Sequence, residues 1–149
     1  MKVVSVQTVF QEVPNEISLS FFISGCKIHC KGCHSSEYWG DVGETLTQEL
    51  YETYLTKYDG FVSCVLFMGG DWCDELPLFL DLARERGMKT ALYTGDTDVA
   101  QQIKSRLNYL KTGEYRDDLG PLDSPDTNQV LMNLDTGEVM NHYFLEHKK

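Results

Sequence analysis

The chain has 149 residues, which is enough for one domain with an ordinary buried core. Its hydrophobic share of 42% and its charged share of 24% are typical of a soluble globular protein, and no apolar run approaches the roughly 20 residues of a membrane span. The formal net charge of −10 argues against broad binding to nucleic acid, because contact with a phosphate backbone needs clustered Lys and Arg. No apolar segment with a cleavage site follows the N-terminus, so we expect a cytoplasmic protein without a signal peptide.

The first half of the chain predicts two strands with a helix between them. The apolar run Ser18–Ser24 is typical of a strand that is buried on both faces. Within Thr45–Tyr58, side chains that can pack recur every four residues and form one stripe of an amphipathic helix, which Thr45 or Thr47 could cap. Val62–Met68 predicts a second buried strand, which ends at a pair of glycines.

The second half continues this alternation. Glu75–Arg86 predicts a helix with Pro77 in its first turn and Gly87 at its end. Met88–Thr94 predicts a third buried strand. Beyond it the pattern predicts a helix that carries Val99, Ile103 and Leu107 and is capped by Asp96 or Thr97, a short strand at Leu107–Leu110, and a hairpin formed by Gln129–Leu134 and Glu138–Tyr143.

The order of these elements predicts the fold class. Alternating strands and helices imply a mostly parallel sheet with right-handed crossovers. Too few units are present to close an eightfold barrel, so we expect a single α/β domain over residues 1–149, shaped as a partial (βα) barrel. Active sites of such sheets lie at the carboxyl ends of the strands. Each of the first three strands is followed there by a distinctive segment, namely a cysteine-rich loop, Gly69–Asp71 and Tyr93–Gly95.

The cysteine-rich loop contains Cys26, Cys30 and Cys33 in the spacing C-x3-C-x2-C. Three thiolates can hold three irons of a [4Fe–4S] cluster and leave the fourth iron open to a substrate. The competing interpretation is a structural zinc site in which His29 or His34 is the fourth ligand. Structural zinc usually draws on two pairs of ligands, and the sequence has no second pair of cysteines. The spacing therefore favours an iron–sulfur cluster over zinc.

The two remaining cysteines stand alone in the sequence. Cys64 alternates within an apolar strand, and we expect it to be a small core residue. Cys73 lies in the loop after Asp71, close to the predicted site. We interpret Cys73 as an incidental thiol, with a redox or auxiliary-ligand role as the alternative.

Residues on the other two segments could hold a ligand beside the cluster. Gly69 and Gly70 allow the backbone to approach a ligand closely, and the carboxylate of Asp71 could accept hydrogen bonds from an ammonium group. Thr94 could contact the same ligand. On the cysteine loop, His34 could contact an adenine ring, with a plain surface position as the alternative.

Taken together, these residues resemble the radical S-adenosylmethionine (SAM) superfamily, and within it the activating proteins of anaerobic ribonucleoside-triphosphate reductases. The resemblance extends over nearly the whole chain. The segments that carry it are ISGCKIHCKGCHSSEYW at Ile23–Trp39, FMGGDW at Phe67–Trp72, LYTG at Leu92–Gly95 and LKTGEYRDDLGPLDSPDTNQ at Leu110–Gln129. The cysteine spacing marks the superfamily, and the last segment with its Thr-Asn-Gln marks the subgroup.

The resemblance implies an oxidoreductase that activates a glycyl-radical enzyme. Cys26, Cys30 and Cys33 would hold one [4Fe–4S] cluster whose open iron binds SAM, and a reduced flavodoxin-type donor would supply one electron. SAM would be cleaved to methionine and a 5′-deoxyadenosyl radical, which would take a hydrogen from a glycine of the reductase catalytic subunit. No catalytic residue beyond the cluster and SAM is implied. The implied SAM contacts are Gly32, Cys33, His34, Gly69, Gly70, Asp71 and Thr94.

Two other functions remain as alternatives. The first is a small radical SAM enzyme that acts on another glycyl-radical enzyme or on a small molecule. The second is a non-catalytic interaction module that is stabilised by zinc. A brown, oxygen-sensitive protein favours either enzyme, whereas a colourless protein with one zinc ion favours the module.

Overall fold

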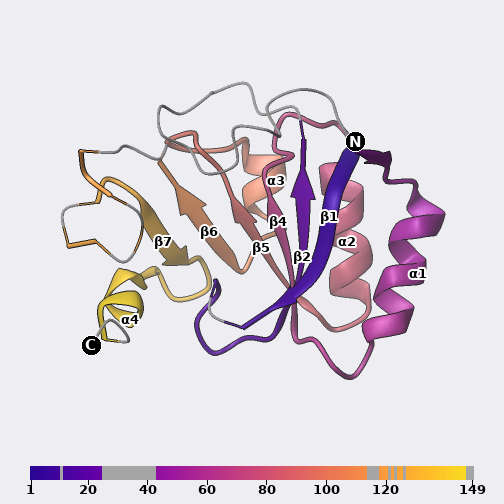
Figure 1. The fold of residues 1–149 in the computed structure, drawn as a ribbon, viewed down its shortest axis with the longest axis horizontal. Coiled ribbons are helices and arrows are strands. Elements are labelled where there is room, and N and C mark those ends of the chain that lie inside the picture. The colour runs from indigo at the N-terminus through magenta and orange to yellow at the C-terminus, as the bar shows by residue number, and fades with distance from the viewer. Residues whose placement is uncertain are drawn as a thin grey trace.

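The computed structural model describes residues 1–10, 12–24, 43–113, 118–120, 122, 124–125 and 127–146. In these parts of the chain, eight strands form one sheet in the order β3-β1-β2-β4-β5-β6-β7-β8 (Figure 1). The strands are β1 (Lys2–Val9), β2 (Ser18–Ile23), β3 (Glu44–Thr45), β4 (Cys64–Met68), β5 (Lys89–Tyr93), β6 (Tyr109–Thr112), β7 (Val130–Asn133) and β8 (Glu138–Val139). The helices are α1 (Gln48–Tyr58), α2 (Leu76–Glu85), α3 (Gln101–Lys104) and α4 (Asn141–Glu146).

The centre of the sheet is parallel and its two sides are antiparallel. β2, β4, β5 and β6 run in the same direction, and Phe22 pairs with Met68, which pairs with Tyr93. The pairings of β1 with β2 and β3, and of β7 with β6 and β8, are antiparallel. The expected α/β class and its parallel centre are therefore confirmed, whereas the sheet as a whole is mixed.

The predicted strands Ser18–Ser24, Val62–Met68 and Met88–Thr94 are confirmed as β2, β4 and β5, within two residues at each end. β1 is a strand that the sequence analysis did not anticipate. Its pairing with β2 shifts register between Val3 and Ser5. Such a bulge interrupts the period of two by which a strand is recognised in a sequence.

The start of α1 is decided by a side chain. The backbone N–H of Leu50 donates to Oγ1 of Thr47 at 3.1 Å, so Thr47 is the N-cap, while Thr45 lies in β3. α2 matches its prediction, with Pro77 in its first turn. No helix in the described ranges is long and apolar enough to cross a membrane.

The predictions of two elements in the C-terminal half of the chain are wrong in part. The helix expected after Asp96 or Thr97 has neither residue as its cap, because α3 begins after Ala100 without a side-chain cap. The backbone N–H of Asp96 instead bonds to Oγ1 of Thr94, which keeps this segment at the sheet edge. The short strand expected at Leu107–Leu110 is β6, displaced to Tyr109–Thr112.

The predicted hairpin is confirmed only at its turn. β7 and β8 pair as expected, but β8 ends at Val139 and the chain then forms α4. The side chain of Asn141 accepts from the N–H of Leu131 at 3.0 Å and donates to the carbonyl of Gln129 at 2.8 Å. Asn141 therefore satisfies backbone groups in and just before β7 that a longer second strand would otherwise pair.

Helices α1, α2 and α3 pack against one face of the sheet (Figure 1). There the rings of Phe21 and Phe67 stack with centroids 5.3 Å apart, and Tyr51 of α1 and Phe79 of α2 lie against them. The buried hydroxyl of Tyr51 donates to the carbonyl of Phe79 at 2.7 Å. This aromatic core fixes the helices and holds the parallel strands against them.

The opposite face of the sheet carries a smaller apolar cluster around Cys64, to which α4 and the segment before β2 contribute. Two tyrosines fasten that segment to the sheet. The hydroxyl of Tyr93 donates to the carbonyl of Glu12, and the hydroxyl of Tyr109 donates to the carboxylate of Glu16 at 2.7 Å. The central strands are therefore covered on both faces, which explains their nearly continuous apolar sequences.

Candidate functional site

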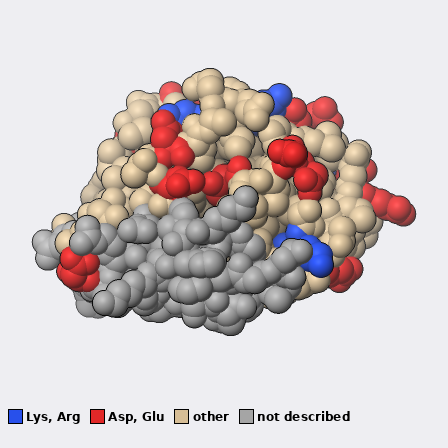
Figure 2. Space-filling model, turned by 90° about the horizontal axis from the view of Figure 1, so that it is seen from above, with Lys and Arg blue, Asp and Glu red and all other residues tan. Residues whose placement is uncertain are grey.

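The carboxyl ends of β2, β4 and β5 lie side by side at one edge of the sheet (Figure 1). Ser24 follows β2, Gly69 follows β4 and Thr94 follows β5, so the segments after these three strands begin at this edge, as predicted. In a view onto this edge, acidic side chains predominate over basic ones (Figure 2). The local charge favours a cationic group of a ligand over an anionic one.

Part of the predicted site lies outside the described residues, namely Cys26, Cys30, Cys33, His29, Gly32 and His34. The described chain reaches this loop at Ser24 and continues after it at Gly43. The N–H of Ser24 donates to the carbonyl of Lys2 at 3.1 Å, which extends the pairing of β1 and β2 up to the loop. The cysteine loop therefore starts from a fixed point at the carboxyl end of β2.

The two glycines after β4 have a backbone that other residues rarely adopt. Gly69 has φ +89° and Gly70 has φ +100°. A Cβ on Gly69 would lie 2.8 Å from the ring of Trp72, and a Cβ on Gly70 would lie 3.3 Å from the side chain of Ile23. Both positions favour glycine for their conformation, and at Gly69 a side chain would also displace Trp72. The pair brings the backbone close to the edge at which the cysteine loop begins.

Asp71 is the titratable group that follows these glycines. Its Oδ1 is buried and has no hydrogen-bond partner among the described residues. Burial raises the pKa of its carboxyl above the usual range; its own backbone N–H and the Thr94 hydroxyl act in the opposite direction, and the carboxylate of Asp96 raises it further. A buried acceptor without a donor costs free energy, so this oxygen favours a ligand that brings a donor. An ammonium group can donate to Oδ1 of Asp71, and its positive charge suits the acidic side chains at this edge.

Thr94 links the end of β5 to Asp71. Its side chain is buried, and its Oγ1 accepts from the N–H of Asp96 at 3.1 Å. The Thr94 hydroxyl lies close enough to the Asp71 carboxyl to lower the pKa of that group. The structure thereby brings together three predicted site residues, Gly70, Asp71 and Thr94. It adds Asp96, which the sequence analysis considered only as a helix cap.

Lys111 is a second residue of this edge that the sequence analysis did not single out. It is 8% exposed, and its Nζ donates to the carbonyl of Thr94 at 3.1 Å and to that of Gly113 at 3.0 Å. The same Nζ lies 5.7 Å from the centroid of the Tyr93 ring. In the sequence, the sign that this lysine is unusual is its place directly after the apolar residues Tyr109 and Leu110 of β6. The ammonium group of Lys111 is therefore a buried cation at the same edge of the sheet as Asp71 and Asp96.

The two described cysteines differ in their surroundings. Cys64 is fully buried, and burial raises the pKa of its thiol to about 12, which confirms it as a core residue. Cys73 is half-buried, and its pKa is also raised, chiefly by burial. No group of three or more His, Cys, Asp or Glu side chains in the described ranges is placed to hold a metal ion. The described parts of the chain thus place Cys73 in no group of three or more such side chains.

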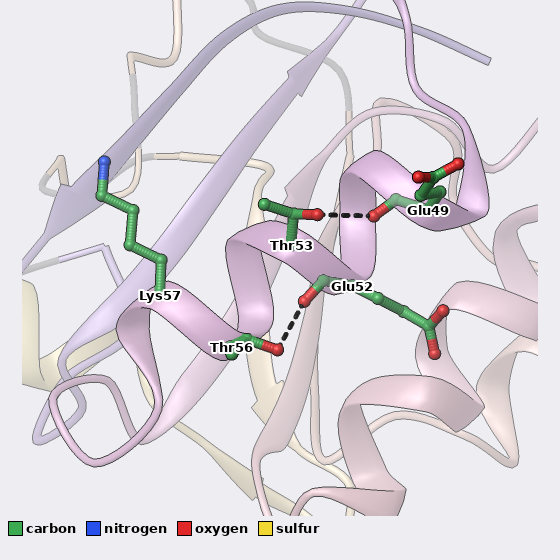
Figure 3. Close-up of a pocket in the computed structure, with 5 residues that line it drawn as sticks. All are labelled: Glu49, Glu52, Thr53, Thr56 and Lys57. Atoms are coloured by element: carbon green, nitrogen blue, oxygen red, sulfur yellow. Dashed lines mark hydrogen bonds between the residues drawn. The ribbon is translucent and has the colours of Figure 1, made fainter.

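A hollow on the outer side of α1 is unrelated to this edge (Figure 3). It has a volume of about 510 Å³ and is lined by Glu49, Glu52, Thr53, Thr56 and Lys57. The hydroxyls of Thr53 and Thr56 bond to backbone carbonyls of their own helix, at 2.9 and 3.0 Å (Figure 3). A shallow surface formed by one helix, with its hydroxyls already engaged, offers no convergent polar groups for a ligand.

Residues 16–114, about two thirds of the chain, match the model of a protein family described as "4Fe-4S single cluster domain". The match begins just before β2 and ends just after Gly113, so it includes the cysteine loop and the edge residues Asp71, Thr94 and Lys111. No curated protein matches the chain. The matched region is therefore the cysteine loop together with the parallel strands that support it.

Proposed function

The chain belongs to the family of 4Fe-4S single cluster domains and is an iron–sulfur protein, and from this premise we propose a specific activity. The protein is a radical SAM activase that generates a glycyl radical on the catalytic subunit of an anaerobic ribonucleotide reductase. A reduced flavodoxin-type protein is its electron donor. Both partners and the enzyme operate in the reducing cytoplasm.

The observation that carries the proposal is the buried Oδ1 of Asp71, which lacks a hydrogen-bond partner among the described residues. It lies after β4, next to the strand end from which the cysteine loop departs. A SAM molecule bound to a cluster on that loop presents an ammonium group, which is the donor that this oxygen lacks. The glycine pair with positive φ supports the same fit, because it allows close approach of a ligand to the backbone.

The proposed cluster ligands are Cys26, Cys30 and Cys33. Three thiolates hold three of four irons and leave one iron for SAM. When bound, the cluster would supply one electron for reductive cleavage of SAM, whose adenosyl part would take a hydrogen atom from a glycine of the partner. The protein contributes binding, orientation and exclusion of water around this chemistry.

The residues of the edge have separate tasks in the proposal. Asp71 accepts hydrogen bonds from the SAM ammonium, and the nearby Thr94 hydroxyl favours the ionised carboxylate by lowering the pKa of Asp71. The backbone at Gly69 and Gly70 would allow the methionyl part of SAM to approach closely. Gly32, Cys33 and His34 are the proposed contacts on the side of the loop. Each of these tasks consists of holding the ligand, and none of them transfers a proton.

Cysteine variants test the cluster assignment. Cys26→Ala, Cys30→Ala and Cys33→Ala should each abolish formation of 5′-deoxyadenosine from SAM, whereas Cys64→Ala should retain it because Cys64 is a buried core thiol. The measurement is chromatography of 5′-deoxyadenosine after anaerobic reduction, together with the iron content of each variant. Full activity in any of the three loop variants would show that the ligand assignment is wrong.

The partner is tested by a radical signal. Incubation of the reduced protein and SAM with an anaerobic reductase should produce the EPR doublet of a glycyl radical. A glycyl-radical enzyme of a different class is the matched control and should give no doublet. SAM cleavage with a radical only on the control enzyme would favour the alternative activase, and a stoichiometric zinc ion without any cluster would favour the interaction module.

A further inference from the structure

Lys111 occupies a position that is costly for a cation. Its side chain is buried at the carboxyl end of β6, and removing an ammonium group from water is unfavourable unless hydrogen bonds replace its hydration. Carbonyls from two segments provide such bonds, at Thr94 after β5 and at Gly113 after β6. The ring face of Tyr93 adds a cation–π contact. The arrangement of the surrounding backbone is therefore adapted to this one ammonium group.

The ammonium group adds to backbone hydrogen bonds that already join the ends of β5 and β6, among them the bond from the N–H of Thr94 to the carbonyl of Lys111 at 2.9 Å. Gly113 donates its N–H to the carbonyl of Asp96 at 2.8 Å, and its carbonyl also accepts from the side chain of Gln129 at 3.4 Å. A Cβ on Gly113 would lie 2.9 Å from the carbonyl oxygen of Asn128. The end of β5, the end of β6 and the Asn128–Gln129 segment thus form one hydrogen-bonded unit with Lys111 inside it.

This unit ends at the proposed cofactor contacts. Lys111 fixes the carbonyl of Thr94, whose hydroxyl accepts from the N–H of Asp96. The carbonyl of the preceding residue, Tyr93, accepts from the N–H of Gly69 at 2.9 Å, so the end of β5 lies beside the segment that carries Asp71. We propose that Lys111 is a positioning residue, whose ammonium group clamps the ends of β5 and β6 so that Thr94 holds Asp71 in the orientation that receives SAM. The proposal rests on the proposed function, because it takes Asp71 to be a contact of SAM.

The clamp gives a role to the segment that marks the subgroup in the sequence. Gln129 is buried, and its backbone N–H bonds to Oγ1 of Thr127 at 3.0 Å, while Oγ1 of Thr127 donates to the carbonyl of Gly120 at 2.9 Å. These bonds hold Gln129 where its amide reaches Gly113. The Thr127–Gln129 segment therefore acts as a support for the clamp, behind the residues that face the ligand.

A double-mutant cycle with Lys111→Met and Asp71→Asn tests the proposal on the cluster-loaded protein. SAM affinity is measured by anaerobic calorimetry, and the iron content and circular dichroism of each variant are recorded. Each single variant should weaken SAM binding about tenfold or more, and the double variant should lose little beyond the larger single effect, since Lys111 acts through Asp71. Additive losses would overturn the positioning role. Lys104→Met is the matched control, because Lys104 is ion-paired to Asp98 on the surface of α3 and should leave SAM affinity unchanged.

Two further measurements keep the test decisive. Lys111→Gln, which is neutral but can still donate to one carbonyl, should show an intermediate loss of affinity; unchanged affinity in a folded Lys111→Gln variant would overturn the proposal. Hydrogen exchange without SAM should show faster exchange at the amides of Thr94, Asp96 and Gly113 in Lys111→Met, with the amides of β2 and β4 unchanged. If Asp71→Asn alone leaves SAM affinity unchanged, Asp71 is not a contact of SAM and the proposed function loses its main support. The exchange data then test separately whether Lys111 holds the ends of β5 and β6 together.

Discussion

The helix-facing core and the carboxyl edge of the same strands differ in the polar groups and backbone conformations that they contain. In the core, Phe21, Phe67 and Phe79 are buried without polar side-chain atoms to satisfy, and the buried hydroxyl of Tyr51 is bonded. At the edge, glycines take positive φ, Asp71 has a buried oxygen without a described partner, and a lysine is buried. The core contributes free energy of folding. The edge lowers the stability of the ligand-free protein and keeps polar groups available for a ligand.

Removing one aromatic ring from the core should give the largest loss of stability. Phe67→Ala should lower the free energy of unfolding by about 3–5 kcal/mol, because it removes the ring that stacks on Phe21 and leaves a cavity. Denaturant unfolding followed by circular dichroism measures the change. Phe61→Ala is the control, since Phe61 is 54% exposed and should cost less than about 0.5 kcal/mol. Equal costs for the two variants would contradict the description of the core.

Adding a methyl group at the edge should lower the free energy of unfolding less than removing a ring from the core. Gly69→Ala should destabilise the protein by about 1–3 kcal/mol, because alanine is strained at φ +89° and its Cβ would displace the ring of Trp72. Gly60→Ala is a matched control with φ +81° and no atom within 4 Å of the added Cβ. The difference between the two free energies of unfolding isolates the contact with Trp72. A larger cost at Gly60 than at Gly69 would be inconsistent with a crowded edge.

Replacing the carboxylate at the edge should stabilise the protein. The pKa of Asp71 is raised in the folded state, so the ionised carboxylate is a penalty that is fully present above that raised pKa and disappears as the pH falls toward the ordinary value of 3.8. Asp71→Asn should therefore raise the Tm at pH 7 by about 2–4 °C, which corresponds to about 1 kcal/mol. Scanning calorimetry at pH 7 and pH 4 measures the gain, which should shrink at the lower pH.

Asp74→Asn is the control for this prediction. Asp74 is an exposed neighbour on the same loop, and its substitution should leave the Tm nearly unchanged at both pH values. A lower Tm for Asp71→Asn at pH 7 would show that Asp71 is paired in the ligand-free protein, and would remove the main support for an ammonium ligand there.

The contrast between core and edge also explains what the sequence predicted. β2, β4 and β5 are buried on both faces, so their apolar runs are visible without knowledge of the fold. The glycines and Asp71 were found because they follow a strand directly. β1 was missed because its bulge breaks the alternation, and the helix cap at Asp96 or Thr97 was wrong because Thr94 takes the N–H of Asp96.

Lys111 was missed for a different physical reason. Its partner at Thr94 is brought to it by the pairing of β5 with β6, which joins residues far apart in the chain, whereas Gly113 follows Lys111 by two residues. Local patterns carry no information about such a pairing until the order of the strands is known. The same holds for Gln129, whose amide reaches Gly113 across the sheet end.

EPR of the anaerobically iron-reconstituted and dithionite-reduced protein, recorded with and without SAM, tests the central claim most directly. The account predicts a reduced [4Fe–4S] signal whose shape changes on addition of SAM, with a weaker change in Asp71→Asn at the same SAM concentration. A cluster signal that SAM leaves unaltered would contradict an open iron at this edge, and a zinc-loaded protein without a cluster signal would contradict the iron–sulfur site itself.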